Sequence, residues 1–178
     1  MESNDDAIGS WEKLKIVGKG GSSTVYKARI DRDGSIVAVK QIDTEGSKSD
    51  ITLGIQREIE TMKNLNHPNI LRYFGTQRSG NKIYIFLEYS SRGSLRQYYL
   101  KKGKFSEAQV AFCTRQVVQG LQYLHENGIA HRDIKCANCL LFRGNTIKLA
   151  DFGASKQIDS ASIVSGLKGT PHWMAPEV

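Results

Sequence analysis

Lys40 and Glu58 are oppositely charged residues on neighbouring predicted elements. Lys40 follows the apolar run Val37–Val39, and Glu58 lies in the next predicted helix beside Ile59. An ion pair joining strand to helix would aim the lysine ammonium at a phosphate group. A surface lysine with its stem packed along apolar residues is the simpler interpretation when Lys40 is considered by itself.

Three side chains with oxygen atoms follow a long helical segment. Asp133 and Asn138 belong to the string His131–Asn138, and Asp151 begins Asp151–Gly153. Carboxylate and amide oxygens suit Mg²⁺, and a carboxylate can orient a hydroxyl for phosphoryl transfer. Each short string is common, whereas their order and spacing together are not.

A glycine-rich segment, Gly18–Val25, stands between two predicted strands. Glycines there let the backbone approach phosphates closely, although a plain hairpin turn has the same composition. A dinucleotide-binding fingerprint would require a helix after the glycines. Val25–Ala28 continues as a strand, which excludes that interpretation.

The first half of the chain predicts strands around one helix. The strands cover Trp11–Val17, Thr24–Ile30, Ser35–Ile42, Ile70–Gly75 and Lys82–Glu88. The helix covers Ile51–Leu65, because Ile55, Ile59 and Met62 recur at helical spacing, and Pro68 stops it.

The second half is predicted to be mainly helical, with a boundary near Ser90–Ser94. Ser106–Gln109 is a capping box that opens a long amphipathic helix ending before Gly128. Its apolar face comprises Val110, Val117, Leu121 and Leu124. Cys139–Phe142 and Ile147–Ala150 predict a small hairpin, and Asp151–Val178 is predicted to be loop.

Composition excludes several classes of protein. The 178 residues are 39% hydrophobic and 24% charged, which is sufficient for a buried core. No apolar run approaches the ~18 residues that span a bilayer, and three cysteines are too few for a disulfide scaffold. Met1–Ser10 carries acids without a base, unlike a signal peptide, and is predicted to be a mobile polar tail. We therefore expect a cytoplasmic protein without membrane insertion.

The net charge of +7 suits an acidic or phosphorylated ligand. It would also suit nucleic acid, but no Lys/Arg block or basic-aromatic interleaving supports that partner. The string Cys136–Cys139 is a C-x-x-C that could be redox-active or half of a zinc site. The sequence has no second Cys/His pair at zinc spacing, so both roles are disfavoured.

Together these strings resemble a eukaryotic serine/threonine protein kinase domain over Trp11–Val178. His131–Asn138, Asp151–Lys156 and Gly169–Val178 resemble the MEKK type of mitogen-activated protein kinase kinase kinases. The resemblance implies an α+β, bilobal fold with a five-stranded antiparallel N-lobe, one helix and a partial helical C-lobe. The implied ranges are a tail at 1–10, an N-lobe at about 11–89, a hinge at about 88–93 and a C-lobe at about 94–178.

The resemblance also implies the site residues and the cofactors ATP and Mg²⁺. Asp133 would be the catalytic base, Lys135 would lie near the transferred phosphate, and Lys40 would pair with Glu58. Asn138 and Asp151 would bind Mg²⁺. The residues implied to contact ATP are Val17, Gly18, Lys19, Gly20, Ser23, Val25, Ala38, Lys40, Leu87, Glu88, Ser90 and Leu140. Ser23 replaces the third glycine of the usual pattern.

Two further features follow from the resemblance. Met62, Tyr73, His131 and Phe152 would stack as a hydrophobic spine. Phosphorylation of Ser165, Ser162 or Thr170 would order the loop around Gln157–Lys168, because the phosphate would pair with Arg132. Thr170 would also shape the substrate site and, with Lys135, disfavours a tyrosine kinase.

The implied activity is transfer of the ATP γ-phosphate to a protein hydroxyl, with a MAP kinase kinase as partner. The alternative is an inactive, kinase-like interaction module, against which the complete set Lys40, Asp133, Asn138 and Asp151 argues. Because such domains continue beyond Ala175–Glu177, we expect an incomplete C-lobe and low activity and stability for this chain.

Overall fold

The computed structural model describes residues 8–20, 23–45, 49–158 and 169–176. Its contacts divide the chain into two compact units, which are described separately. The first comprises residues 1–65 and 72–89, and the second comprises residues 66–71 and 90–178. Within the described ranges no helix is both long and apolar enough to cross a membrane.

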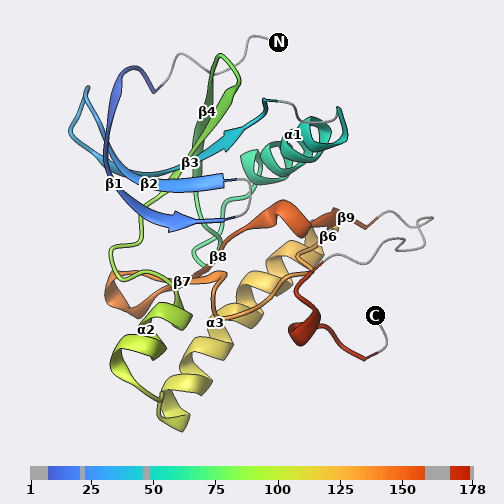
Figure 1. Cartoon of the computed structure of the whole chain (residues 1–178). Coiled ribbons are helices and arrows are strands. Elements are labelled where there is room, and N and C mark those ends of the chain that lie inside the picture. Colours follow the sequence, from blue (N-terminus) through green and yellow to red (C-terminus); the bar gives the residue numbers. More distant parts are fainter. Residues whose placement is uncertain (1–7, 21–22, 46–48, 159–168, 177–178) are drawn as a thin grey trace. The chain divides into compact units, whose positions relative to one another are not determined.

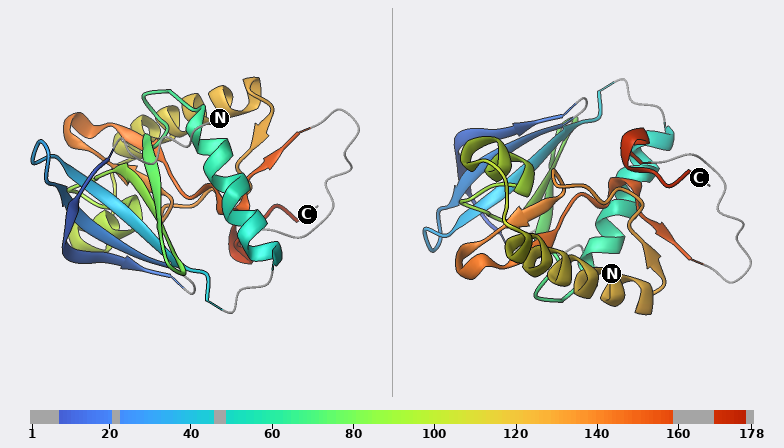
Figure 2. Two further views of the ribbon diagram at one scale, coloured as in Figure 1. Left: turned by 90° about the horizontal axis from the view of Figure 1, so that it is seen from above. Right: turned by 90° about the horizontal axis from the view of Figure 1, so that it is seen from below.

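The first unit is built on a five-stranded antiparallel sheet with strand order β1-β2-β3-β5-β4 (Figure 1). The strands are β1 (Trp11–Lys19), β2 (Ser23–Ile30), β3 (Ile36–Asp43), β4 (Tyr73–Ser79) and β5 (Lys82–Glu88). The helix α1 (Ser49–Lys63) lies beside β4 (Figure 2). The predicted five strands and single helix are therefore confirmed.

One face of this sheet carries a core of Ala28, Ile30, Val37, Val39 and Phe86, and Ile8 packs against it. Of the range 1–10 predicted as a tail, the structure describes only residues 8–10, and among these Ile8 is buried. A Cβ on Gly75 would lie 2.8 Å from Ile8 Cδ1, so glycine leaves the room that this side chain needs.

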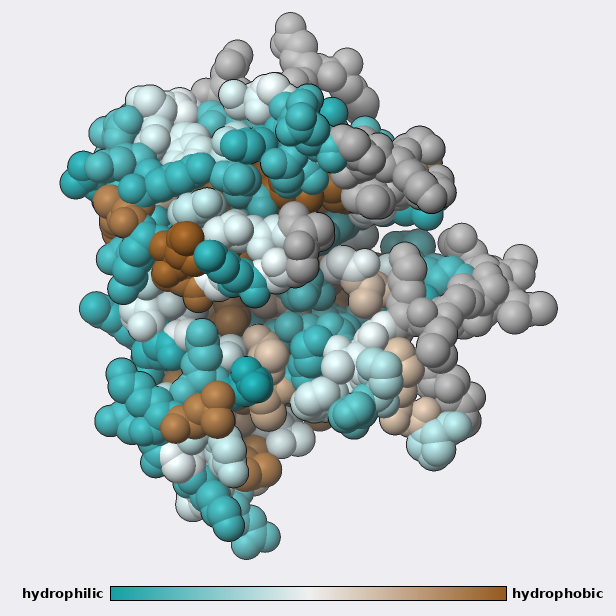
Figure 3. Space-filling view, in the orientation of Figure 1, coloured by the Kyte–Doolittle hydropathy of each residue, from teal (hydrophilic) through white to brown (hydrophobic). Residues whose placement is uncertain are grey.

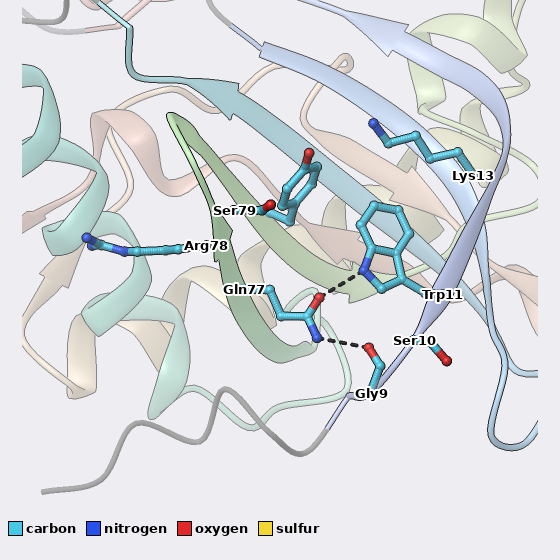
Figure 4. Close-up of a pocket in the computed structure, with 8 residues that line it drawn as sticks. Gly9, Ser10, Trp11, Lys13, Gln77, Arg78 and Ser79 are labelled. Atoms are coloured by element: carbon cyan, nitrogen blue, oxygen red, sulfur yellow. Dashed lines mark hydrogen bonds between the residues drawn. The ribbon is translucent and has the colours of Figure 1, made fainter.

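The Gln77 side chain holds the segment after Ile8 against the sheet through two hydrogen bonds (Figure 4). The Trp11 indole donates to Gln77 Oε1 at 2.8 Å, and Gln77 Nε2 donates to the Gly9 carbonyl at 2.9 Å. A side chain in β4 thus satisfies polar groups on both sides of Ser10.

In its described residues, the second unit has two helices and two small antiparallel sheets. The helices are α2 (Leu95–Lys102) and α3 (Glu107–Glu126). β7 (Cys139–Leu141) pairs with β8 (Ile147–Leu149), and β6 (Ile129–Ala130) pairs with β9 (Lys156–Gln157). Three short 3₁₀ turns cover Arg143–Asn145, Phe152–Ala154 and Pro171–Trp173.

Side chains cap both helices. The predicted box at Ser106 and Gln109 forms, and a second, unpredicted box joins Ser94 to Gln97 at the start of α2. The predicted apolar face of α3 is only partly covered, because Leu124 is buried whereas Val110 is half exposed.

The predicted strand Ile70–Gly75 is wrong in its first half. Leu71 N donates to the Leu149 carbonyl at 2.9 Å, and Ile70 forms a parallel bridge with Leu149. Ile70 and Leu71 therefore belong to the second unit, where Asn69 Nδ2 also donates to the Ile147 carbonyl at 2.8 Å. An apolar run does not specify which strand it will pair with.

Candidate active site

Four side chains form one hydrogen-bonded network in the second unit. Lys135 Nζ lies 2.8 Å from Asp133 Oδ2 and 2.5 Å from Thr170 Oγ1. The Thr170 hydroxyl donates to Asp133 Oδ1 at 2.5 Å, and Asn138 Nδ2 donates to Asp133 Oδ2 at 2.9 Å. Both oxygens of the Asp133 carboxylate are thus held in fixed directions.

Hydrogen bonds between side chains and the backbone position the loop that carries Asp133. Asp133 N donates to His131 Nδ1 at 3.3 Å, so Nδ1 is the acceptor and the ring proton is on Nε2. His131 Nε2 therefore donates to the Ala150 carbonyl at 3.0 Å. Burial lowers the pKa of His131 and so favours the neutral ring, whose tautomer these two hydrogen bonds select. Asn138 Nδ2 adds a bond of 2.9 Å to the Asp133 carbonyl.

The environment of Asp133 favours its ionised form. Burial of the carboxyl opposes ionisation, but hydrogen bonds from Lys135, Thr170 and Asn138 and the charge of Lys135 outweigh it. The pKa of Asp133 is therefore lowered. The group is a carboxylate at neutral pH.

Gly169 brings Thr170 close to the loop, a role that sequence reasoning missed. Its φ is 136°, and a Cβ there would lie 2.6 Å from the Arg132 carbonyl oxygen. A side chain cannot be accommodated against this backbone atom. The sequence feature that could have indicated this role is the glycine directly before Thr170.

Asn138 and Asp151 lie at facing ends of β7 and β8. The residue before Asp151, Ala150, donates its N–H to the Asn138 carbonyl at 2.9 Å. Both hydrogen bonds of the Asn138 amide use its nitrogen, which directs the amide oxygen away from Asp133. Asp151 is exposed and has a left-handed φ of 64°. Two hard oxygen donors on adjacent strand ends fit a small divalent cation that keeps waters and substrate oxygens as its other ligands.

Lys40 and Glu58 form a close ion pair in the first unit. Lys40 Nζ lies 2.6 Å from Glu58 Oε1, and the two side chains are only 17% and 8% exposed. The pair joins β3 to α1 and fixes the direction of the ammonium.

The predicted nucleotide-contacting side chains of this unit share one sheet face. Val25 pairs with Lys40, and Ala38 pairs with Leu87, so alternation places these four side chains on the same side. Gly18, in β1, is opposite Val25, and Val17 and Lys19 flank it. Gly20 N donates to the Ser23 carbonyl at 2.8 Å, whereas Gly21 and Ser22 lie outside the described residues.

The other residues predicted to contact ATP include Glu88 and Ser90, on either side of the point where the chain passes from the first unit to the second. Glu88 ends β5, and its N–H donates to the Arg72 carbonyl at 3.0 Å. Ser90 Oγ donates to the Leu141 carbonyl at 2.5 Å in the second unit, where Leu140 lies on β7.

The structure describes the predicted spine and the predicted phosphorylation sites only in part. His131 and Phe152 pack with ring centroids 5.1 Å apart, while Met62 and Tyr73 lie in the other unit, so the complete spine stays a prediction. Arg132 Nε donates to the Ala154 carbonyl at 2.7 Å. Ser162, Ser165 and Glu177 lie outside the described residues.

The three cysteine thiols are free. Burial raises the pKa of Cys113, and it raises that of Cys139 to about 12, which suppresses their thiolate forms. Among the described residues no group of three or more His, Cys, Asp and Glu side chains is arranged to hold a metal. The geometry thus adds nothing to the redox or zinc interpretations of the C-x-x-C.

Comparison with known proteins relates this arrangement to one family. The family model "Protein kinase domain" matches residues 11–178. Mitogen-activated protein kinase kinase kinase 1b of Physcomitrium patens is 42% identical over 172 residues, covering 95% of this chain and 22% of the relative.

Two further relatives come from other organisms. Mitogen-activated protein kinase kinase kinase ANP1 of Arabidopsis thaliana is 44% identical over 178 residues, covering 95% of this chain and 27% of the relative. Cell division control protein 7 of Schizosaccharomyces pombe is 45% identical over 163 residues, covering 91% of this chain and 15% of the relative. The chain thus spans about a quarter or less of the length of these relatives.

Proposed function

The chain belongs to the protein kinase domain family, and on that premise we propose that it transfers the γ-phosphate of ATP to a serine or threonine hydroxyl of a protein. The network of Asp133, Lys135 and Thr170 is the observation that supports this most directly. It places a carboxylate, an ammonium and a hydroxyl within hydrogen-bonding distance of one another.

Asp133 is proposed to accept a hydrogen bond from the acceptor hydroxyl and to orient it toward the phosphorus. Phosphoryl transfer needs little covalent assistance, so positioning and charge neutralisation account for most of the rate. A carboxylate of lowered pKa is suited to orientation, because it stays ionised. Lys135 is proposed to neutralise charge on the transferred group.

In the first unit, Lys40 is proposed to hold the α- and β-phosphates. Its pairing with Glu58 gives the ammonium one fixed direction before ATP binds. Val25, Ala38 and Leu87 supply an apolar surface for adenine on the same sheet face. Val17, Leu140 and backbone groups of Gly18, Lys19, Gly20, Ser23 and Glu88–Ser90 complete the proposed contacts.

Asn138 and Asp151 are the residues proposed to hold Mg²⁺. An amide oxygen and a carboxylate match the preference of this cation for hard oxygen ligands. When bound, the cation would neutralise phosphate charge.

The finer proposal is that the substrate is a MAP kinase kinase. It rests on the printed names of the relatives that are 42% and 44% identical. Incubating the chain with Mg·ATP and inactive MAP kinase kinases of several classes tests it, with myelin basic protein as a general acceptor. Phosphate transfer to the general acceptor alone would support the kinase and contradict the specific partner.

Phosphorylation within Ser160–Thr170 is proposed to raise activity, with Ser165 and Ser162 as candidates. Thr170 is the weakest candidate, because its hydroxyl is bonded to Asp133 and Lys135 and a phosphate would lie against the carboxylate. Mapping of phosphorylated residues before and after phosphatase treatment, with activity measured on both samples, tests this switch.

The competing function is a kinase-like interaction module without turnover. Binding of Mg·ATP measured by calorimetry, together with phosphate transfer by the chain and by Asp133→Asn, separates the two. We expect transfer by the unaltered chain and about a hundredfold or greater loss in the variant. Nucleotide binding with equal, negligible transfer by both proteins supports the module instead.

A further inference from the structure

An apolar groove lies between α2, the start of α3 and the β7–β8 turn in the second unit. It has a volume of about 280 Å³. Leu95 and Tyr98 line it from α2, Phe105 and Phe112 from the approach to α3 and its second turn, and Leu141 from β7. Figure 3 shows apolar side chains among hydrophilic ones over these two helices. None of these residues belongs to the proposed catalytic network.

The floor of this groove is formed before any partner binds. Leu95 and Leu141 are buried, and the rings of Tyr98 and Phe105 stack with centroids 5.4 Å apart. Phe112 nevertheless stays 51% exposed. A fixed apolar floor with one exposed aromatic ring offers area that a partner can bury without ordering the groove first.

Exposed basic residues lie at the groove and beside its lining residues in the sequence. Arg92 lines the groove, and Lys101, Lys102, Lys104 and Arg143 are each within a few residues, along the chain, of Tyr98, Phe105 or Asn145, which also line it. We call these five residues the basic rim. Lys101 and Lys102 follow Tyr98 by three and four residues and so share its side of α2. Within the described part of the chain, no ion pair is formed by any of the five.

Arg92 connects this rim to the floor. Its guanidinium lies over the Tyr98 ring at 5.4 Å, and Nη1 donates to Asn145 Oδ1 at 2.8 Å. Between Arg92 and Arg115 the sequence holds one acid, Glu107, so this segment, which supplies most of the groove lining, carries a positive net charge.

We propose that this groove docks an acidic amphipathic segment of a partner protein, whose apolar side chains contact Phe112 and Tyr98 and whose carboxylates face the basic rim. Charge complementarity selects this occupant, since an apolar floor lined by Arg92 and flanked in sequence by further exposed cations favours carboxylates beside the anchoring side chains. Docking of such a segment does not require phosphoryl transfer, so it is tested by measuring peptide binding.

The probe is a display library of random short peptides selected against the 178-residue chain. We expect the enriched peptides to combine Leu, Ile or Phe with several Asp or Glu residues. Their affinity, measured by fluorescence anisotropy, should fall as the salt concentration rises. Enrichment of basic peptides, or of none, would contradict the proposal.

Paired variants locate the binding. Phe112→Ser and the double variant Lys101→Glu, Lys104→Glu should each weaken an enriched peptide by about tenfold or more. Val118→Ser is the matched apolar control, because Val118 is 55% exposed on the same helix and does not line the groove. Arg78→Glu, in the first unit, is the charge control. Both controls should bind normally, and a thermal melt should show that every variant is folded.

Cys113 provides a second readout, because it lines the groove whereas the exposed Cys136 does not. Bound peptide should slow alkylation of Cys113 and leave that of Cys136 unchanged, as mapped by mass spectrometry. Equal rates at both thiols with and without peptide would place binding elsewhere.

Two other occupants would overturn the proposal. Concentration-dependent dimerisation that Phe112→Ser abolishes would assign the groove to a second copy of the chain. Binding to phosphatidylserine vesicles that requires the rim lysines but tolerates Phe112→Ser would assign the rim to a lipid surface.

Discussion

Thr170 Oγ1 lies 2.5 Å from Asp133 Oδ1, although the two residues are 37 positions apart in the sequence. The same hydroxyl accepts a hydrogen bond from Lys135 at 2.5 Å. One threonine oxygen therefore links the carboxylate proposed to orient the acceptor hydroxyl with the lysine proposed to meet the phosphate. The site is completed by a residue far outside the string that carries its charged groups.

Thr170→Ala should lower kcat by about tenfold to a hundredfold, because Asp133 and Lys135 lose their common partner. Thr170→Ser keeps the hydroxyl and should retain most of the activity. Mg·ATP affinity, measured separately, should be nearly equal in the two variants. A serine variant as slow as the alanine variant would assign the effect to the methyl group instead.

The pKa of Asp133 should rise when Lys135 is replaced by methionine, because both a hydrogen bond and a positive charge are removed while burial of the carboxyl remains. A carboxyl-carbon NMR titration, with Asp133→Asn to assign the signal, measures the shift. An unchanged pKa would contradict the assigned cause.

The lowered pKa of Asp133 also predicts the sign of a stability change. Its contribution to folding should be complete above the ordinary value of 3.8 and should be lost as pH falls through the lower folded value. The difference in unfolding free energy between the unaltered chain and Asp133→Asn should therefore shrink in acid. Chemical denaturation at several pH values measures it.

Lys40→Met should abolish most phosphate transfer and also lower stability. Lys40 does not fill the core, but it is paired with the buried Glu58, whose charge would be left without this partner. Removing one partner of such a pair costs roughly 2–4 kcal/mol, somewhat below a fully buried pair because Lys40 is 17% exposed. Adding Glu58→Gln should restore stability without restoring transfer, as urea denaturation and activity assays would show.

Gly169→Ala should displace Thr170 and lower turnover by about tenfold or more, because a Cβ at this position meets the Arg132 carbonyl. Gly144→Ala is the matched control: its φ is 70°, and a Cβ there has no neighbour within 4 Å among the atoms that the structure describes. The control should lose about 1 kcal/mol of stability and no activity. Equal turnover in the two variants would argue against the close approach.

Ile8→Ala should lower the free energy of unfolding by about 2–3 kcal/mol, because Ile8 is buried against Gly75 and the sheet core. Ile36→Ala removes a side chain that is 39% exposed on the same sheet and should cost less. Equal losses in urea denaturation would show that Ile8 is not part of the core in solution.

Local chemistry in the sequence determined much of this protein. The capping box at Ser106 and the helical spacing of Ile55, Ile59 and Met62 each act over a few residues, so the helices they predict are present. The order and spacing of the short strings likewise indicated the protein kinase domain family, which the comparisons confirm.

Only the tertiary structure decided how distant segments pair. Ile70 and Leu71 look like the start of β4, yet they bond to Leu149 in the other unit. Ile8 belongs to a sequence of tail-like composition but is buried, and Thr170 reaches Asp133 only because Gly169 admits the close approach. A strand's pairing partner and a side chain's burial depend on packing against residues far along the chain, and neither composition nor short-range periodicity encodes that partner.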